Sequence, residues 1–496
     1  MTRRATLAKA SVVAIAALTL GACTSQHRAA SPTPSTSPSA VSPRIASPPS
    51  TVLSSPMSPV VTTTTPSASG GTSNTATSTP KPIWPTYHHD NARSGVAAAA
   101  PAVTTLKVAA TAKLDGALYA SPLVLRDATG PLVIAATENN TLYALRDDGQ
   151  VVWSKHLGTP VDGSTLPCGN INPTGITGTP AYDAASGMVF AVAFLSGDKH
   201  VLVAVDAETG AVAWTRPVDA PGSHSNVEQQ RPALLVSGGR VWIAYGGLWG
   251  DCGPYHGYLV GIATNGQGDA VIYQDPTTRE GGFWAPTGPA ADAAGHLYVP
   301  VGNGAATSPN DSYDMTDGVI ELDGANVASY FAPSTWASDN AHDYGTTGVV
   351  LLPTGQVFIN GKSGIAYLLK QGDLGGITAN ASSIAVCRAF GGPAYANGLV
   401  YVPCTDGVRA VRVDGPAMTT AWHASPAGSP VIGGGVVLSV DARGGTLYAL
   451  DPASGAVRAK VALGDTATRF VAPAIGDDGH AYVGTQHGTL VVVATS

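Results

Sequence analysis

One short pattern recurs along the chain and limits its fold more than any other feature. The stretches TLYALRDDGQVVW (141–153), VLVAVDAETGAVAW (201–214) and TLYALDPASGAVRA (446–459) each join two β-rich runs through a turn that contains Asp and Gly. Aligned on the third residue of LYAL, eight copies appear at Ala144, Ala204, Gly261, Glu321, Leu368, Ala410, Ala449 and Val492. Repeats spaced by about 40 to 60 residues are typical of propellers and solenoids.

Each repeat contains enough short strands for one blade. Seven of the eight units open with a proline before a short apolar run, at Pro122, Pro180, Pro232, Pro289, Pro393, Pro430 and Pro473. This run is followed by a turn, a second apolar run, the LYAL element and a final run such as VVWSK. Four strands joined by tight turns predict an all-β protein, an eight-bladed β-propeller.

The two ends of the repeat region predict how the ring closes. The last unit stops one strand short, whereas TTLKVAATAKL (104–114) is a strand with no unit of its own. We expect this N-terminal strand to complete the last blade, because closure removes exposed sheet edges.

Composition agrees with a large exported β-protein. The chain has 496 residues, 44% of them hydrophobic and 12% charged, with 59 Gly and 37 Pro. The net charge of -7 gives no electrostatic reason to expect nucleic acid as a partner.

The first residues have the pattern of an export signal. A basic start, the apolar run SVVAIAALTL and LGAC ending at Cys23 resemble the signal and lipobox of bacterial lipoproteins, with residues 1–22 removed and Cys23 lipidated. The alternative is an ordinary signal peptide with an incidental cysteine. Residues 23–82, rich in Ser, Thr and Pro, predict a disordered tether, and residues 83–496 the propeller. We therefore expect export and a lipid anchor on the outer face of the cytoplasmic membrane.

Four further cysteines suggest two disulfide bonds in an exported protein, although free buried thiols are the alternative. Of the three possible pairings we favour Cys387–Cys404, which flank one inner strand of the sixth unit. The other two, Cys168 and Cys252, each precede Gly in a long loop, and we expect their bond to tie these loops together.

A resemblance to a known superfamily rests on IWPTYHHDNARSG (83–95), the Ala-x-Ser-Pro unit openings and the repeated LYALDPASGAVRA. Together they resemble the propellers of the pyrroloquinoline quinone (PQQ) type. That superfamily includes quinoprotein alcohol dehydrogenases and an outer-membrane assembly lipoprotein, so the resemblance implies the fold and leaves the function open.

The dehydrogenases of this superfamily hold calcium or a lanthanide beside the quinone through a Glu and an Asn, and an Asp acts as the base. The resemblance implies that Asn303, in YVPVGNGAATSPNDSYD, is the metal ligand and Asp343, in WASDNAHDYGTTG, the base. Trp284 could stack on a flat cofactor. The alternatives are turn residues for Asn303 and Asp343 and a core position for Trp284.

Two features differ from the dehydrogenase pattern. No adjacent Cys-Cys pair is present, and the expected Glu ligand has only Glu228 as a weak candidate. The run His88, His89 and Asp90 also invites a metal interpretation, but adjacent strand residues point to opposite sides, so we do not expect a metal there.

The long insertions indicate where a ligand would bind. Units one to four carry extra segments at 159–175, 246–257 and 304–317, and such loops over a rigid ring usually form the binding surface. We expect a binding or scaffold module for a protein or an envelope ligand. The alternatives are a dehydrogenase that uses PQQ and calcium, and a factor in envelope protein assembly.

Overall fold

The computed structural model describes residues 79–338, 343–378, 382–425 and 428–496. They fall within one compact unit, Thr75–Ser496. The expected signal peptide, Cys23 and the tether up to residue 78 lie outside the described residues. Among the described residues, no helix has the length and apolar character needed to span a membrane.

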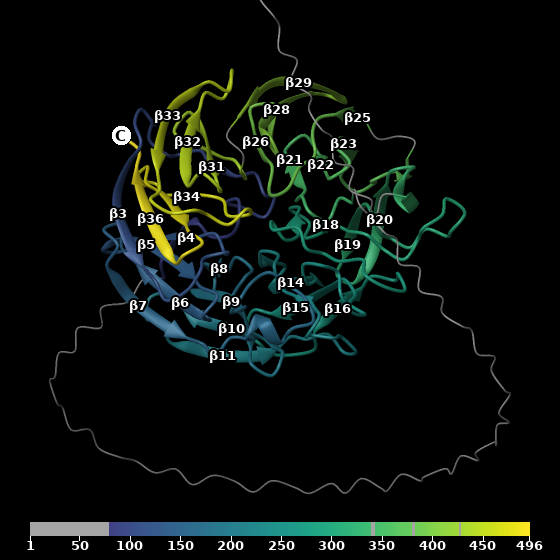
Figure 1. Ribbon diagram of the computed structural model, residues 1–496, viewed down its shortest axis with the longest axis horizontal. Helices are drawn as coiled ribbons and strands as arrows, with labels where there is room; N and C mark the ends of the chain where they lie inside the picture. Colours follow the sequence, from purple (N-terminus) through teal and green to yellow (C-terminus); the bar gives the residue numbers. More distant parts are fainter. Residues whose placement is uncertain (1–78, 339–342, 379–381, 426–427) are drawn as a thin grey trace, which may run out of the picture. The chain divides into compact units, whose positions relative to one another are not determined.

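Eight sheets form the blades of a β-propeller (Figure 1), which confirms the predicted fold class. Blade 1 comprises β1 (Lys81–Trp84), β4 (Leu123–Asp127), β5 (Gly130–Ala136), β6 (Thr141–Leu145) and β7 (Val151–His156), and blade 2 comprises β8 (Ala181–Asp183), β9 (Met188–Leu195), β10 (Lys199–Asp206) and β11 (Val212–Pro217). Blade 3 comprises β12 (Glu228–Gln229), β13 (Leu235–Ser237), β14 (Arg240–Gly247), β15 (Tyr258–Ala263) and β16 (Val271–Gln274), and blade 4 comprises β17 (Ala290–Ala291), β18 (Leu297–Pro300), β19 (Val319–Asp323), β20 (Asn326–Ala332) and β24 (Gly376–Ile377).

The second half of the ring follows the same order. Blade 5 comprises β21 (Val350–Leu352), β22 (Gln356–Asn360), β23 (Ile365–Lys370) and β25 (Ser382–Ala385), and blade 6 comprises β26 (Ala394–Ala396), β27 (Leu399–Cys404), β28 (Gly407–Asp414) and β29 (Ala417–Ala424). Blade 7 comprises β2 (Val96–Ala97), β30 (Val431–Gly433), β31 (Val436–Asp441), β32 (Thr446–Leu450) and β33 (Val457–Ala462), and blade 8 comprises β34 (Ala474–Ile475), β35 (Ala481–Gly484), β36 (Thr489–Ala494) and β3 (Lys107–Lys113). Short 3-10 turns occur at Gly163–Thr165 and Trp336–Ser338.

The LYAL element forms the third of the four strands of each repeat, as predicted; in blades 1 and 7 an additional N-terminal strand joins the inner edge. The residues of the LYAL element are largely buried on both faces, as in β6, whereas the outer strand β7 alternates between exposed and buried positions. Blade faces therefore pack against each other, while the outer strand has one face in solvent.

Tryptophans in outer strands join neighbouring blades in one recurring way. The indoles of Trp153, Trp214 and Trp422 cover Gly210, Gly266 and Gly455, respectively, in the turn of the next blade. Trp153 shows why glycine is required: a Cβ on Gly210 would lie 2.7 Å from the indole, and the φ of Gly210 is 72°. The indole N–H of Trp153 also donates to the carbonyl of Ala207 at 3.0 Å.

The N-terminal strand closes the ring. Strand β3 pairs antiparallel with β36, from Lys107 opposite Ala494 to Lys113 opposite Thr489. In Figure 1 the dark blue β3 lies beside the yellow β36. The unpaired strand of the sequence and the incomplete last blade therefore complete each other, as predicted.

The segment before β3 covers the inner edges of the blades. Its backbone carbonyls accept bonds from inner-strand amides of blades 2, 4, 5, 6 and 7, in the pairs Pro85 with Tyr182, Asn91 with Ala291, Ala92 with Leu351, Ser94 with Tyr395 and Gly95 with Ile432. The fully buried Arg93 donates to the carbonyls of Pro289, Leu234 and Tyr87. This one segment thus satisfies donors that the inner strands would otherwise leave unpaired.

Both favoured disulfide bonds are present. Cys168 pairs with Cys252, and Cys387 pairs with Cys404. The first joins the 159–175 and 246–257 insertions, as expected from their long loops.

The interblade tryptophan contact leads to a stability prediction. We expect Trp153→Ala to lower the free energy of unfolding by about 3–5 kcal/mol, because it removes a large buried side chain and leaves a cavity over Gly210. Chemical denaturation followed by fluorescence would measure the change. Trp249→Ala is the matched control, since Trp249 is 64% exposed, and an equal loss in both variants would contradict the packing role.

Candidate functional site

A cavity of about 720 Å³ lies on the axis of the ring, where all eight blades contribute to its walls. Tyr87, from the segment that covers the inner edges, also lines it. The insertions tied by Cys168–Cys252 supply Asn170 and residues 247–251. Two of the three insertions expected to form the binding surface therefore reach this cavity, which we call the central pocket.

Cationic side chains dominate the walls of the central pocket. Its lining includes five of them, Arg231, Lys362, Arg388, Arg443 and Arg469, but only one carboxylate, that of Asp251. Among the described residues, none of the four arginines forms an ion pair with an acidic group. The four arginines therefore give the pocket a positive charge that no ion pair within the described residues offsets.

Aromatic rings support several of these arginines. The guanidinium of Arg469 lies 4.8 Å from the ring centre of Phe390, and that of Arg388 lies 5.5 Å from the same ring. Arg231 lies 5.3 Å from the ring of Phe470. Burial, followed by repulsion from Arg443 and Arg388, lowers the pKa of Arg469. Cation–π contacts with these two phenylalanine rings therefore stabilise the positions of the three guanidinium groups.

Trp284 lines the central pocket from a cradle of glycines. A Cβ on Gly246, Gly282 or Gly302 would lie within 2.8 Å of its indole, and one on Gly345 would lie 2.9 Å from its Nε1. The indole therefore packs against bare backbone on several sides while part of it remains accessible to the pocket. This arrangement holds a flat surface in place.

Asn303 is nearly buried and is joined to a carboxylate that the sequence analysis missed. Its side-chain amide donates to Oε2 of Glu280 at 2.5 Å. Burial raises the pKa of Glu280, while Arg279 and Asn303 oppose this shift. Glu280 has a left-handed backbone, with φ of 67°, which is uncommon for this residue type.

Asp343 is fully buried and forms an ion pair with Lys362, a lining residue of the central pocket. Burial raises the pKa of Asp343, and the ammonium of Lys362 opposes the shift. Its Oδ1 is buried and has no hydrogen-bond partner within the described part of the chain. A proton-accepting oxygen is therefore held next to a cation.

The structure brings the three candidates together from separate segments. A Cβ on Gly345, two residues after Asp343, would lie 2.8 Å from the backbone of Gly302, which precedes Asn303. The same Cβ on Gly345 would lie 2.9 Å from Nε1 of Trp284. The three residues thus form one continuous group beside the central pocket.

Other candidates lie elsewhere. Glu228 is buried in β12, accepts a bond from the amide of His224 and does not line the central pocket. The carboxylate that contacts Asn303 is that of Glu280, and not that of Glu228. His88 is fully buried against Tyr87, its Nδ1 lies 3.0 Å from the carbonyl of Pro393, and burial lowers its pKa to about 3. His89 lies beside Asp90.

The residues around Trp284 fit a quinone with a hard metal ion. Calcium takes oxygen ligands, and Asn303, Glu280 and Asp343 offer an amide oxygen and two carboxylates. The lone Oδ1 of Asp343 is an oxygen that a cation or a substrate hydroxyl would satisfy. The cationic walls of the central pocket match carboxylates on a flat ring system.

Comparisons with known proteins agree with this fold. Residues 107–282 match the family described as outer membrane protein assembly factor BamB. Among solved structures, the chain is similar to quinohemoprotein alcohol dehydrogenase from Comamonas testosteroni, with 17% identity, a TM-score of 0.67 and coverage of 85% of this chain and 81% of that one. A europium-containing methanol dehydrogenase is 15% identical, with a TM-score of 0.63 and coverage of 83% of this chain and 98% of that one. BamB from Moraxella catarrhalis is 15% identical, with a TM-score of 0.53 and coverage of 78% of this chain and 97% of that one.

The described chain is an eight-bladed β-propeller that is similar in fold both to dehydrogenases and to an assembly factor. At these identities the solved structures establish the fold alone. No curated protein matches the sequence significantly.

One buried carboxylate near the pocket leads to a pH prediction. Glu138 accepts bonds from the amide of Gly175 and the hydroxyl of Thr177, and burial raises its pKa from 4.5 to about 7. The folded state therefore binds this proton more tightly than the unfolded state. The stability that this group contributes is full below pH 4.5 and is lost as the pH rises to about 7.

We expect the melting temperature to fall between pH 5 and pH 8, and Glu138→Gln to make this fall smaller. Thermal unfolding across this range would measure both. Glu208→Gln changes a carboxylate in a surface turn and should leave the slope unchanged. A slope that is the same in wild type and Glu138→Gln would contradict the assignment.

Proposed function

We propose that the protein is an exported, lipid-anchored binding module whose central pocket takes a planar polyanion. The observation that carries this proposal is the convergence of four arginines without acidic partners on one axial pocket. Export and anchoring through Cys23 rest on the leader pattern of the sequence.

The charge pattern favours an anion for a physical reason. Like charges held close together in a partly buried pocket repel each other, so their assembly costs stability. A ligand with several carboxylates would remove this repulsion and accept hydrogen bonds from guanidinium groups, which bind carboxylates in a two-pronged geometry. Such a pocket lowers the stability of the empty protein, and a bound anion would restore it.

The aromatic surfaces favour a flat ligand. Trp284, Phe390 and Phe470 all line the central pocket together with the cations. A planar ring system would stack on these faces while its carboxylates reach the arginines. PQQ, a fused-ring quinone with three carboxylates, has both properties and is the ligand that we propose to test first.

A PQQ-dependent dehydrogenase is the second candidate, and the grouping of Trp284, Asn303 and Asp343 favours it. When bound, the quinone would supply the two-electron acceptor for oxidation of an alcohol. Asn303 and Glu280 would hold the metal, and Trp284 would support the ring. Asp343 would take the hydroxyl proton on its free Oδ1, and the ammonium of Lys362 favours the ionised form of this carboxyl against the effect of burial.

A third candidate, a docking platform for envelope proteins, is favoured by the rim of the same pocket. Trp249 is 64% exposed and lies in the insertion held by Cys168–Cys252. A large exposed indole on a tethered loop suits contact with a protein. The match to the family described as an assembly factor supports this candidate.

The anion proposal is tested with two variants. We expect Arg388→Gln combined with Arg469→Gln to weaken PQQ binding by about 100-fold, since each charge-assisted hydrogen bond contributes about 1.5 kcal/mol. Isothermal titration calorimetry of the full chain would measure the dissociation constant. Arg412→Gln is the matched control, because Arg412 is exposed in β28 and does not line the pocket.

Mellitate, a benzene ring with six carboxylates, separates a general polyanion site from a quinone site. Binding of mellitate but not PQQ would keep the anion proposal and remove the dehydrogenase. If the wild-type chain binds neither compound, the central pocket is not a polyanion site, and the docking platform becomes the preferred function.

The dehydrogenase candidate is tested through calcium. We expect calcium to tighten PQQ binding in the wild type, and Asn303→Ala to remove this calcium effect while leaving binding without calcium within about threefold, because the amide is a metal ligand and not a quinone contact. Dye-linked alcohol oxidation should fall at least about 100-fold in Asp343→Asn. Calcium-independent binding without turnover in the wild type would leave a binding protein.

A further inference from the structure

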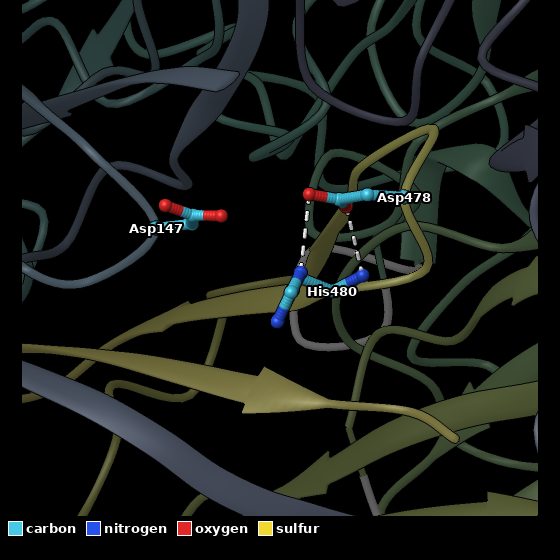
Figure 2. A group of neighbouring side chains, drawn as sticks. All are labelled: Asp147, Asp478 and His480. Carbon is cyan, nitrogen blue, oxygen red and sulfur yellow. Dashed lines mark hydrogen bonds and ion pairs between the residues drawn. The ribbon is translucent and has the colours of Figure 1, made fainter. Parts of the chain in front are cut away.

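Three potential metal ligands face one another at the junction of blades 8 and 1. Asp147 lies in the turn between β6 and β7, and Asp478 and His480 lie in the turn between β34 and β35. One ligand atom of each lies within 4.8 Å of the other two. Figure 2 shows the carboxylate of Asp147 directed toward the pair formed by Asp478 and His480. We call these three residues the seam cluster.

The seam cluster bridges the two blades that the ring closure brings together. Asp478 and His480 belong to the last blade of the chain, and Asp147 belongs to the first. Arg126 of β4 already spans this junction through its bonds to both carboxylate oxygens of Asp477. The guanidinium of Arg126 also acts electrostatically on Asp478, while its direct hydrogen bonds go to Asp477.

Several polar atoms of the seam cluster lack hydrogen-bond partners. Nδ1 of His480 is buried and makes no hydrogen bond, although it lies 3.1 Å from Oδ2 of Asp478. Within the described part of the chain, Asp147 takes part in no hydrogen bond or ion pair. The two carboxylates that face this gap repel each other unless a positive charge lies between them.

Tyr482 provides an independent sign of a missing ligand. Its side chain is fully buried, and its hydroxyl has no hydrogen-bond partner within the described residues. The hydroxyl lies in the electrostatic field of Asp478 and Asp147, and its ring centre is 6.4 Å from that of His480. A fully buried hydroxyl that is left without a partner beside a charged cluster calls for an unseen group, such as a bound ion with its water.

Blade 4 contains a related turn in which the tyrosine hydroxyl has a partner. In the sequences DAAGHLYV and DDGHAYV, His296 and Tyr298 match His480 and Tyr482, while Ala294 stands at the position of Asp478 and Asp292 at that of Gly476. In blade 4, however, the tyrosine hydroxyl donates to Glu321 at 3.0 Å, and Val492 occupies the equivalent strand position in blade 8. Blade 4 thus pairs its tyrosine internally, whereas blade 8 leaves the hydroxyl free and adds Asp147 from the next blade.

We propose that Asp147, Asp478 and His480 bind a divalent transition-metal ion, with zinc as the ion tested, and that this ion fastens blade 8 to blade 1. One imidazole and two carboxylates form a ligand set that zinc accepts, and water would fill the fourth position. The hydroxyl of Tyr482 would donate to that water or to a ligand carboxylate. The site is separate from the central pocket and does not depend on its function.

The test uses the full chain without a histidine tag. We expect zinc to bind in calorimetry and to raise the melting temperature by about 2–5 °C at saturating ion, because an ion that binds only the folded state stabilises it. Asp147→Asn should weaken zinc binding at least about tenfold and remove most of the temperature rise. Since Asp147 is half-buried and makes no hydrogen bond or ion pair within the described residues, this variant should fold and melt as the wild type does without zinc.

His296→Gln is the matched control, because it alters the related turn of blade 4 and should leave zinc binding unchanged. Tyr482→Phe should weaken zinc binding, since it removes only the hydroxyl. The proposal is overturned if zinc does not bind the wild type, if Asp147→Asn binds zinc as tightly as the wild type, or if His296→Gln instead removes the binding.

Discussion

The pairing of β3 with β36 is the contact on which the rest of the structure depends. There a strand from the beginning of the repeat region supplies the missing outer strand of the last blade. Without it, blade 8 would present an unpaired outer edge and blade 1 would have no fixed neighbour on one side. The central pocket draws residues from all eight blades, so its geometry exists only in the closed ring.

Closure also explains how the chain can hold so much like charge on its axis. Arg388, Arg443 and Arg469 come from blades 6, 7 and 8, and their mutual repulsion acts to push these blades apart. Tryptophan contacts between blades and the β3–β36 ladder oppose that force. Such a concentration of like charge costs stability in the empty protein, which is the usual price of a preformed binding site.

Short sequence patterns predicted the features of the fold that form within one repeat or between matching positions of two repeats. The blade repeat, the closing strand and both disulfide pairings follow from runs of residues that are near in sequence or that share a unit position. Trp284, Asn303 and Asp343 were predicted as site residues through resemblance, and their roles remain predictions. The arginines of the central pocket, Glu280 beside Asn303 and the seam cluster were not found, because ring geometry alone brings them together. Glu321 could have been noticed in the sequence, because a carboxylate stands there at the position of LYAL that is Ala or Gly in most other copies.

Departures from the repeat are where the polar chemistry of this propeller concentrates. Blade 4 replaces the small residue at the LYAL position with Glu321, and the hydroxyl of Tyr298 then has a partner within its own blade. Blade 8 keeps an apolar residue there, Val492, so the hydroxyl of Tyr482 has no such partner. The carboxylate that completes its cluster, Asp147, comes from blade 1. The same hairpin is therefore self-contained in one blade and incomplete in the other until the ring has closed, which makes closure a condition for the seam cluster as much as for the central pocket.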